Sequence, residues 1–161
     1  MITMRNLAAA CVLLAASLAH ADSSVPEKGA VAPVLASLQR SACYGRCPIY
    51  KVTVLRDGTV LWEGERFVKV TGKATAKLSA AALADLAKAF ARADFFALQD
   101  KYESYDVTDH PSAITIFDDG KRKKTIRHYH GDRSAPKVLD ELEERIDEVV
   151  GAARWIGRDQ R

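Results

Sequence analysis

The stretch IYKVTVLRDGTVLWEG, residues 49–64, decides how this chain folds. Two segments of alternating apolar side chains flank Arg56-Asp57-Gly58, a turn sequence typical of a β-hairpin. A two-residue loop would mix the apolar and polar faces, whereas a three-residue loop with a left-handed Gly58 keeps the apolar side chains on one face. We therefore predict the three-residue register. It pairs Val54 with Val60 and Val52 with Trp62, and it places Tyr50 on the same face.

The first 21 residues have the pattern of a secretory signal peptide. Arg5 precedes an apolar run at residues 7–18, and Ala19-His20-Ala21 has the small-x-small form of a cleavage site. We expect cleavage near Ala21 and a periplasmic or secreted protein. The apolar run is too short to span a bilayer, which needs about twenty residues. No transmembrane segment is therefore expected in the mature chain.

The rest of the chain has the length of a single domain. We expect a flexible leader at residues 22–33, one α+β domain at 34–157 and a tail at 158–161. Without Arg5 the basic residues number 23 against 21 acidic ones. This small excess argues against nucleic-acid binding, which normally requires a strong basic bias.

Further elements follow from hydrophobic periodicity and capping residues. Ser79 is a candidate N-cap for a helix that ends near residue 93. The predicted order is β-β-β-α-β-β-α, an antiparallel sheet of about five strands with two helices packed on one face. Trp155 and Ile156 are expected to pack the C-terminal tail onto this body. The other predicted strands are 34–40, 113–117 and 124–130, and the second helix is 135–150.

Cys43 and Cys47 flank a glycine-containing turn that precedes the hairpin. In an oxidising compartment the simplest interpretation of this pair is a structural disulfide. A redox or metal-binding dithiol is the alternative, because Cys-x-x-x-Cys-Pro also occurs in copper-delivery proteins of the thioredoxin fold. In those proteins the motif begins a helix, which lowers the thiol pKa, whereas here Cys47 leads into a strand.

The sequence resembles an uncharacterised bacterial family, domain of unknown function 6438. The resemblance covers residues 35–155 and is carried by the core Cys-x-Gly-x-Cys-Pro-x-Tyr at residues 43–50. Its members resemble exported proteins and lipoproteins, and the resemblance implies no activity. Other matching segments are Val52-Thr53-Val54, Asp57-Gly58-Thr59-Val60, Glu63-Gly64, Phe95-Phe96, Tyr102, Ile114-Thr115-Ile116 and His128-Tyr129.

Two histidines are candidate metal ligands. His128 and His130 are two residues apart on a predicted strand, so both project to one face. With His110 or with the cysteines they could complete a copper or zinc site. The simpler interpretation is a polar strand end whose side chains hydrogen-bond to their neighbours.

Two charged segments have similar alternatives. The basic run 121–124 could attract anionic lipids or cell-wall polymers, or it could be a solvated hairpin tip. The acidic residues between 100 and 109 could line a hydrolase or sugar-binding groove, or they could form a hydrated loop.

No nucleophile elbow, phosphate loop or zinc-protease helix occurs, which argues against catalysis and leaves a small hydrolase built on the acidic loop as the least favoured hypothesis. We predict a non-catalytic envelope binding or assembly module, whose partner is an unknown envelope protein or cell-wall component. The alternative is a periplasmic copper- or zinc-binding or thiol-redox protein that uses Cys43, Cys47, His128 and His130.

Overall fold

The computed structural model describes residues 32–157, which form an α+β fold with one mixed sheet and three helices. The predicted signal peptide, most of the leader and the tail at 158–161 lie outside the described residues. Within 32–157, no helix has the length and apolar character needed to cross a membrane. The strands are β1 (Val34–Arg40), β2 (Ile49–Leu55), β3 (Thr59–Arg66), β4 (Gly72–Lys77), β5 (Lys101–Tyr102), β6 (Ser112–Asp118) and β7 (Lys123–Tyr129). The helices are α1 (Ala80–Arg92), α2 (Lys137–Val150) and α3 (Ala153–Ile156).

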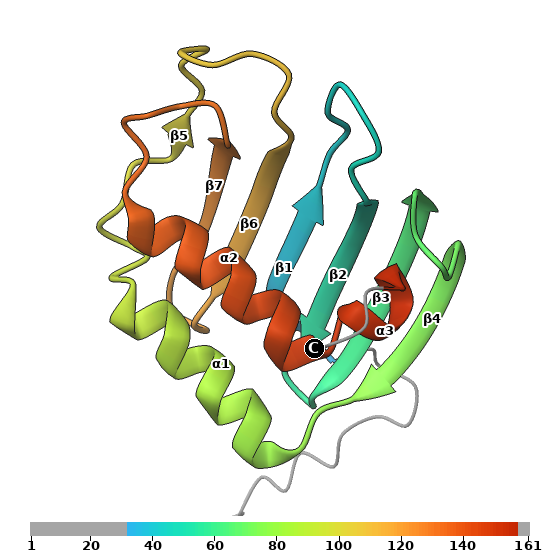
Figure 1. The fold of residues 1–161 in the computed structure, drawn as a ribbon. Helices are drawn as coiled ribbons and strands as arrows, with labels where there is room; N and C mark the ends of the chain where they lie inside the picture. Colours follow the sequence, from blue (N-terminus) through green and yellow to red (C-terminus); the bar gives the residue numbers. More distant parts are fainter. Residues whose placement is uncertain (1–31, 158–161) are drawn as a thin grey trace, which may run out of the picture. The chain divides into compact units, whose positions relative to one another are not determined.

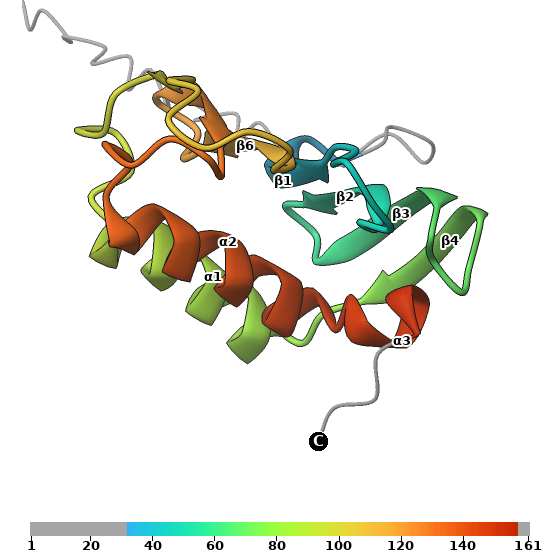
Figure 2. The same cartoon turned by 45° about the horizontal axis from the view of Figure 1, so that its top comes forward.

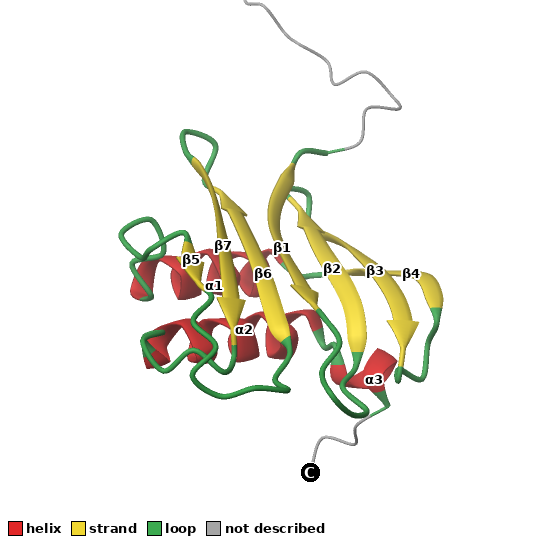
Figure 3. Ribbon diagram, turned by 90° about the horizontal axis from the view of Figure 1, so that it is seen from above, coloured by secondary structure: helices red, strands yellow, loops and turns green. Residues whose placement is uncertain are grey.

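The strands of the described region form one sheet in the order β4-β3-β2-β1-β6-β7-β5. Neighbouring strands are antiparallel except β5 and β7, which are parallel. Helices α1 and α2 lie side by side on one face of this sheet (Figure 1, Figure 2). In the view from above, β7, β6 and β1 cross both helices, whereas β3 and β4 extend beyond the ends of the helices (Figure 3). The prediction that the two long helices cover a single face is therefore confirmed.

The predicted sheet of about five antiparallel strands is wrong in number and in type. Strand β4 has the sequence GKATAK, whose small and charged side chains lack the large apolar alternation that marks a strand. Strand β5 has only two residues, and its parallel pairing with β7 makes the sheet mixed. Both missed strands are edge strands, where little apolar burial is needed, whereas the inner strands lie close to their predicted positions.

The β2–β3 hairpin has the predicted register. Val52 pairs with Trp62, and Val54 pairs with Val60. The turn places Gly58 at a φ of 85°, a left-handed conformation that glycine adopts without a steric penalty. All four paired side chains are completely buried, so this hairpin supplies one side of the core.

The C-terminal segment packs onto the body as the short helix α3, which the sequence indicated only as a packed tail. The Trp155 ring stacks on Trp62 with the ring centroids 5.1 Å apart, and Trp62 stacks in turn on Tyr50. The backbone N–H of Val70 donates to the carbonyl oxygen of Trp155 at 2.9 Å. Helix α3 therefore covers the core beside β3.

The two long helices bury apolar stripes against the sheet. Ser79 caps α1 as predicted, because its hydroxyl accepts a hydrogen bond from the backbone N–H of Ala82 at 3.1 Å. In α2 the buried stripe is interrupted by the carboxylate of Glu143, which has no exposed surface. The apolar members of the α2 stripe are Leu139, Leu142, Ile146 and Val150.

Candidate functional site

Glu143 lies in the middle of the core-facing stripe of α2, directly opposite the end of β7. Burying an ionised carboxylate is costly unless the charge is paired and hydrogen-bonded. The β6–β7 register, which the sequence left open, pairs Ala113 with His128 and turns the His128 side chain toward α2. His128 is 2% exposed, and its Nδ1 lies 3.0 Å from Oε1 of Glu143.

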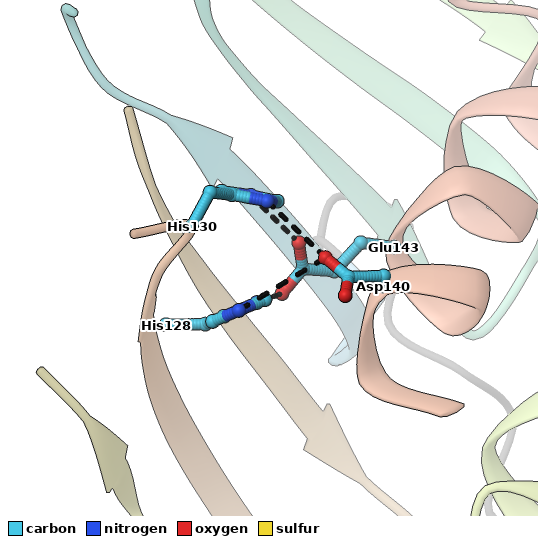
Figure 4. Close-up of side chains that lie close together, drawn as sticks. All are labelled: His128, His130, Asp140 and Glu143. Carbon is cyan, nitrogen blue, oxygen red and sulfur yellow. Dashed lines mark hydrogen bonds and ion pairs between the residues drawn. The ribbon is translucent and has the colours of Figure 1, made fainter. Parts of the chain in front are cut away.

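Two further side chains complete a compact cluster with this buried pair. His130 follows the end of β7, and its Nε2 lies 3.2 Å from Oε2 of Glu143. Asp140 lies one helical turn before Glu143, and its Oδ1 is 3.2 Å from Nδ1 of His130 and 3.9 Å from Nε2 of His128. One nitrogen or oxygen from each residue falls within 4.8 Å of the others (Figure 4). We call His128, His130, Asp140 and Glu143 the His–carboxylate cluster.

The cluster leaves one buried polar atom without a hydrogen bond. Oε2 of Glu143 is inaccessible to solvent, and its close contact with His130 lacks hydrogen-bond geometry. Nearly all buried polar atoms in folded proteins have a hydrogen-bond partner, so such an atom requires an explanation. An oxygen of this kind, in a carboxylate that contacts both imidazoles of the cluster, is a suitable ligand atom for a cation.

The electrostatics of the buried pair favour charge on both partners. Burial alone would lower the pKa of His128, but the hydrogen bond to Glu143 and the charges of Glu143, Asp140 and Asp132 outweigh it, so the pKa is raised. Burial alone would raise the pKa of Glu143, but its contacts with His128 and His130 outweigh it, so the pKa is lowered. Each partner of the buried pair therefore favours the charged form of the other.

A second buried group adjoins the cluster from β1 and β2. The guanidinium of Arg40 lies against Asp147, with Nε and Nη2 each 2.9 Å from Oδ2. Tyr50 donates its hydroxyl hydrogen to Oδ1 of Asp147 at 2.7 Å. Burial and the charge of Asp147 raise the pKa of Tyr50, so the phenol stays protonated and keeps this bond. Arg40 also lies 3.7 Å from Oε2 of Glu143, which links the two groups.

The cluster opens to solvent on the side of His130 and Asp140. These side chains are 21% and 45% exposed, whereas His128 and Glu143 are closed off. A hollow of about 500 Å³ lies beside them and gives small molecules a route to the cluster. The polar residues that line this hollow are Arg40, His130, Asp140, Glu144, Asp147 and Glu148.

The structure separates the predicted ligand set into two parts. His128 and His130 do project to the same face, with ring centroids 4.4 Å apart. Cys43 and Cys47 instead lie in the β1–β2 turn, with their sulfur atoms 1.98 Å apart, at the distance that the predicted disulfide requires. Neither sulfur belongs to the His–carboxylate cluster, and neither does His110. The expected ligand set of both cysteines and both histidines is therefore not brought together.

Asp140 and Glu143 were not anticipated as site residues. The available signal was Glu143 itself, because a charged residue at a position of the helical stripe between Leu139 and Ile146 contradicts the apolar pattern. Its partner could not be read from the sequence, since only the packing of α2 against β7 identifies the histidines.

Three carboxylates of the acidic loop have local partners of their own. Asp100 pairs with Lys124 at 3.0 Å, and Glu103 pairs with Arg127 at 2.7 Å. Asp106 accepts a hydrogen bond from the Ser104 hydroxyl. These carboxylates therefore serve separate local contacts, as the hydrated-loop interpretation expects.

The basic run is not uniformly solvated. Lys124 is only 14% exposed in its side chain and donates to the carbonyl oxygens of Phe96 and Leu98. The Arg122 guanidinium lies over the Phe96 ring, 3.9 Å from its centroid. Half of the run thus holds the β6–β7 hairpin against the segment after α1.

The fold and the cluster together define an α+β domain with a His–carboxylate cluster between the sheet and a covering helix. Residues 34–150 match the family described as "Domain of unknown function (DUF6438)", and the chain belongs to this family. The matched region contains the whole cluster and both cysteines. No curated protein matches the chain.

Proposed function

We propose that this domain binds one divalent transition-metal ion through His128, His130, Asp140 and Glu143. The observation that carries the proposal is Oε2 of Glu143, a buried carboxylate oxygen that has no hydrogen bond and lies 3.2 Å from Nε2 of His130. The other oxygen of the same carboxylate, Oε1, contacts His128. Two nitrogen and two oxygen ligands form a set that suits first-row divalent ions.

Charge balance supports a divalent ion. Asp140 and Glu143 supply two negative charges, while Asp147 is already paired with Arg40. Metal ligands must be deprotonated, so a bound ion competes with the proton that the raised pKa of His128 favours. The ion would then neutralise the two carboxylates of the cluster.

The ligand set favours zinc(II) over copper(I). Copper(I) prefers soft sulfur ligands, and the two sulfurs of Cys43 and Cys47 lie outside the cluster, at bonding distance from each other. Imidazole and carboxylate ligands match zinc(II) and, more tightly still, copper(II). The donor set therefore disfavours copper(I) and fits both zinc(II) and copper(II). Zinc(II) is the first to test because it has no redox chemistry.

The role in the cell envelope is part of the same proposal. The signal-peptide pattern at residues 1–21 supports an exported domain, and the sulfurs of Cys43 and Cys47, which lie at bonding distance, are compatible with an oxidising compartment. In that setting the domain acts as a non-catalytic metal-binding module. An envelope protein or cell-wall component as its partner is compatible with this role and rests on the sequence alone.

Metal titration of the metal-free protein tests the proposal. We expect one zinc(II) ion per chain in competition with a chromophoric chelator, and Glu143→Gln and His130→Ala should each weaken binding by about tenfold or more. Glu141→Gln and His110→Ala are matched controls, because Glu141 pairs with Lys137 on the exposed side of α2 and His110 is outside the cluster. Sub-stoichiometric binding, or equal loss in the control variants, would contradict the proposal.

A further inference from the structure

Arg40 has one arm that faces the His–carboxylate cluster and is not held by Asp147. Nε and Nη2 are fixed by Asp147, and Nε also lies 3.1 Å from the Tyr50 hydroxyl. Nη1 points the other way and lies 3.4 Å from Nε2 of His130 and 3.7 Å from Oε2 of Glu143. Asp147 therefore fixes the orientation of the guanidinium, and the remaining nitrogen, Nη1, lies next to the cluster.

A permanent cation beside a cation site requires a reason. Arginine stays charged at any physiological pH, and it repels a metal ion at this distance. Asp147 offsets part of this repulsion but engages only the far side of the guanidinium. A ligand that carries negative charge, placed between the ion and Nη1, would turn the repulsion into attraction on both sides.

The separation fits a bridging carboxylate. An ion bound to Oε2 of Glu143 at about 2.1 Å lies within about 5.8 Å of Nη1, given the 3.7 Å contact. A carboxylate that gives one oxygen to the metal at about 2.1 Å and the other to the guanidinium at about 2.9 Å spans this separation. Arginine favours such planar oxyanions because its donors match their geometry.

The lining of the hollow decides between kinds of oxyanion. Glu144 and Glu148 lie on its wall in addition to Asp140 and Asp147, and these carboxylates repel each additional negative charge on a ligand. Ala153 and Ile156 supply an apolar part of the wall. The lining therefore disfavours phosphate and suits a monocarboxylate with a short apolar body.

We propose that the hollow binds a small monocarboxylate, with its carboxylate between the metal ion and Arg40 and its apolar body against Ala153 and Ile156. This inference rests on the proposed metal site. Arg40 is then a ligand-binding residue, which Asp147 and Tyr50 hold in position.

The test uses the full mature chain loaded with cobalt(II), whose visible absorption reports its coordination, whereas zinc(II) is silent. Sodium acetate, propionate, butyrate and phosphate are titrated separately at constant ionic strength, with perchlorate as the balancing salt. We expect a saturable spectral change with the carboxylates, with affinity rising from acetate to butyrate and exceeding that of phosphate. Arg40→Met should weaken propionate binding by about tenfold or more. Arg127→Met, which removes an exposed arginine paired with Glu103, should leave it unchanged.

The outcomes separate the two proposals. If cobalt(II) does not bind, the metal site itself is refuted and the ligand site with it. If cobalt(II) binds and its spectrum is insensitive to carboxylates, only the ligand site is refuted. Tighter binding of phosphate than of propionate also overturns it. These readings come from the unaltered chain, so they hold even if Arg40→Met does not fold.

Discussion

Nδ1 of His128 lies 3.0 Å from Oε1 of Glu143, and both side chains are sealed between β7 and α2. A buried ion pair rarely stabilises a protein more than apolar side chains of similar size would, because both charges must be desolvated. This pair also leaves Oε2 of Glu143 without a hydrogen bond. Burying the His128–Glu143 pair therefore costs free energy, and the same two side chains are well placed to bind a cation.

Breaking the pair on one side should destabilise the metal-free protein. Glu143→Leu leaves the raised-pKa imidazole of His128 without its carboxylate, and we expect a loss of about 3 kcal/mol in the free energy of unfolding. The double variant His128→Leu, Glu143→Leu should recover most of that loss, because both charges are removed together. Urea unfolding in the presence of a chelator measures both changes. A double variant that is less stable than the single one would show that the pair is structural.

As the pH decreases, metal affinity should begin to fall at a higher pH than it does for an ordinary histidine site. The pKa of His128 is raised in the metal-free state, so protons compete with the metal already above the usual histidine value of 6.5. The pKa of Glu143 is lowered, so this carboxylate stays ionised and does not contribute to the loss. We expect about a tenfold loss of zinc affinity per pH unit for one competing proton. Chelator competition between about pH 5.5 and 8 follows the change.

The variant Asp132→Asn tests why the loss of zinc affinity begins at this higher pH. Asp132 raises the pKa of His128 through its charge and is not part of the His–carboxylate cluster. Asp132→Asn removes the charge and keeps an oxygen acceptor for the backbone N–H and the hydroxyl of Ser134, although it gives up the acceptor for the backbone N–H of Ser104. The onset should move to lower pH. An unchanged onset would assign the effect to other groups.

The inner fold was predictable because it follows from hydrophobic pattern. The register of the β2–β3 hairpin could be derived since a slip of one residue would expose Val52 and Val54. Strand β4 escaped prediction because an edge strand needs few large apolar side chains, and β5 because two residues carry no period. The central strands of the sheet could therefore be predicted from the sequence, whereas the edge strands could not.

The two histidines of the candidate site could be predicted from the sequence, and its two carboxylates could not. His128 and His130 stand out by their spacing, but their ligand partners come from a helix that begins seven residues after His130. Sequence reasoning grouped them with Cys43 and Cys47, because histidine and cysteine are the residue types most often found together in metal sites. Packing instead brings carboxylates to the histidines and leaves the cysteines at the β1–β2 turn.

The contact between Trp62 and Trp155 should dominate the docking of α3. Trp155 is 7% exposed and stacks on Trp62, which is completely buried. Trp155→Ala should lower the free energy of unfolding by about 3 kcal/mol, through lost burial and the cavity that remains. The chain has two tryptophans, so their coupled near-ultraviolet circular dichroism should also disappear. Arg154→Ala removes the guanidinium that lies over the Trp155 ring but keeps both rings, so it should retain the coupling. A signal that persists in Trp155→Ala would rule out this stack as its source.

The cysteine pair should stabilise the β1–β2 turn without affecting the metal. The loop that the Cys43–Cys47 bond closes is so short that its removal should cost only about 2 kcal/mol. The double variant Cys43→Ser, Cys47→Ser should bind zinc(II) with unchanged affinity, because neither sulfur belongs to the His–carboxylate cluster. Before any reduction, the purified mature chain should give no reaction with a thiol reagent under denaturing conditions. Two reactive thiols per chain would contradict the disulfide, and loss of zinc binding in the double variant would return the cysteines to the ligand set.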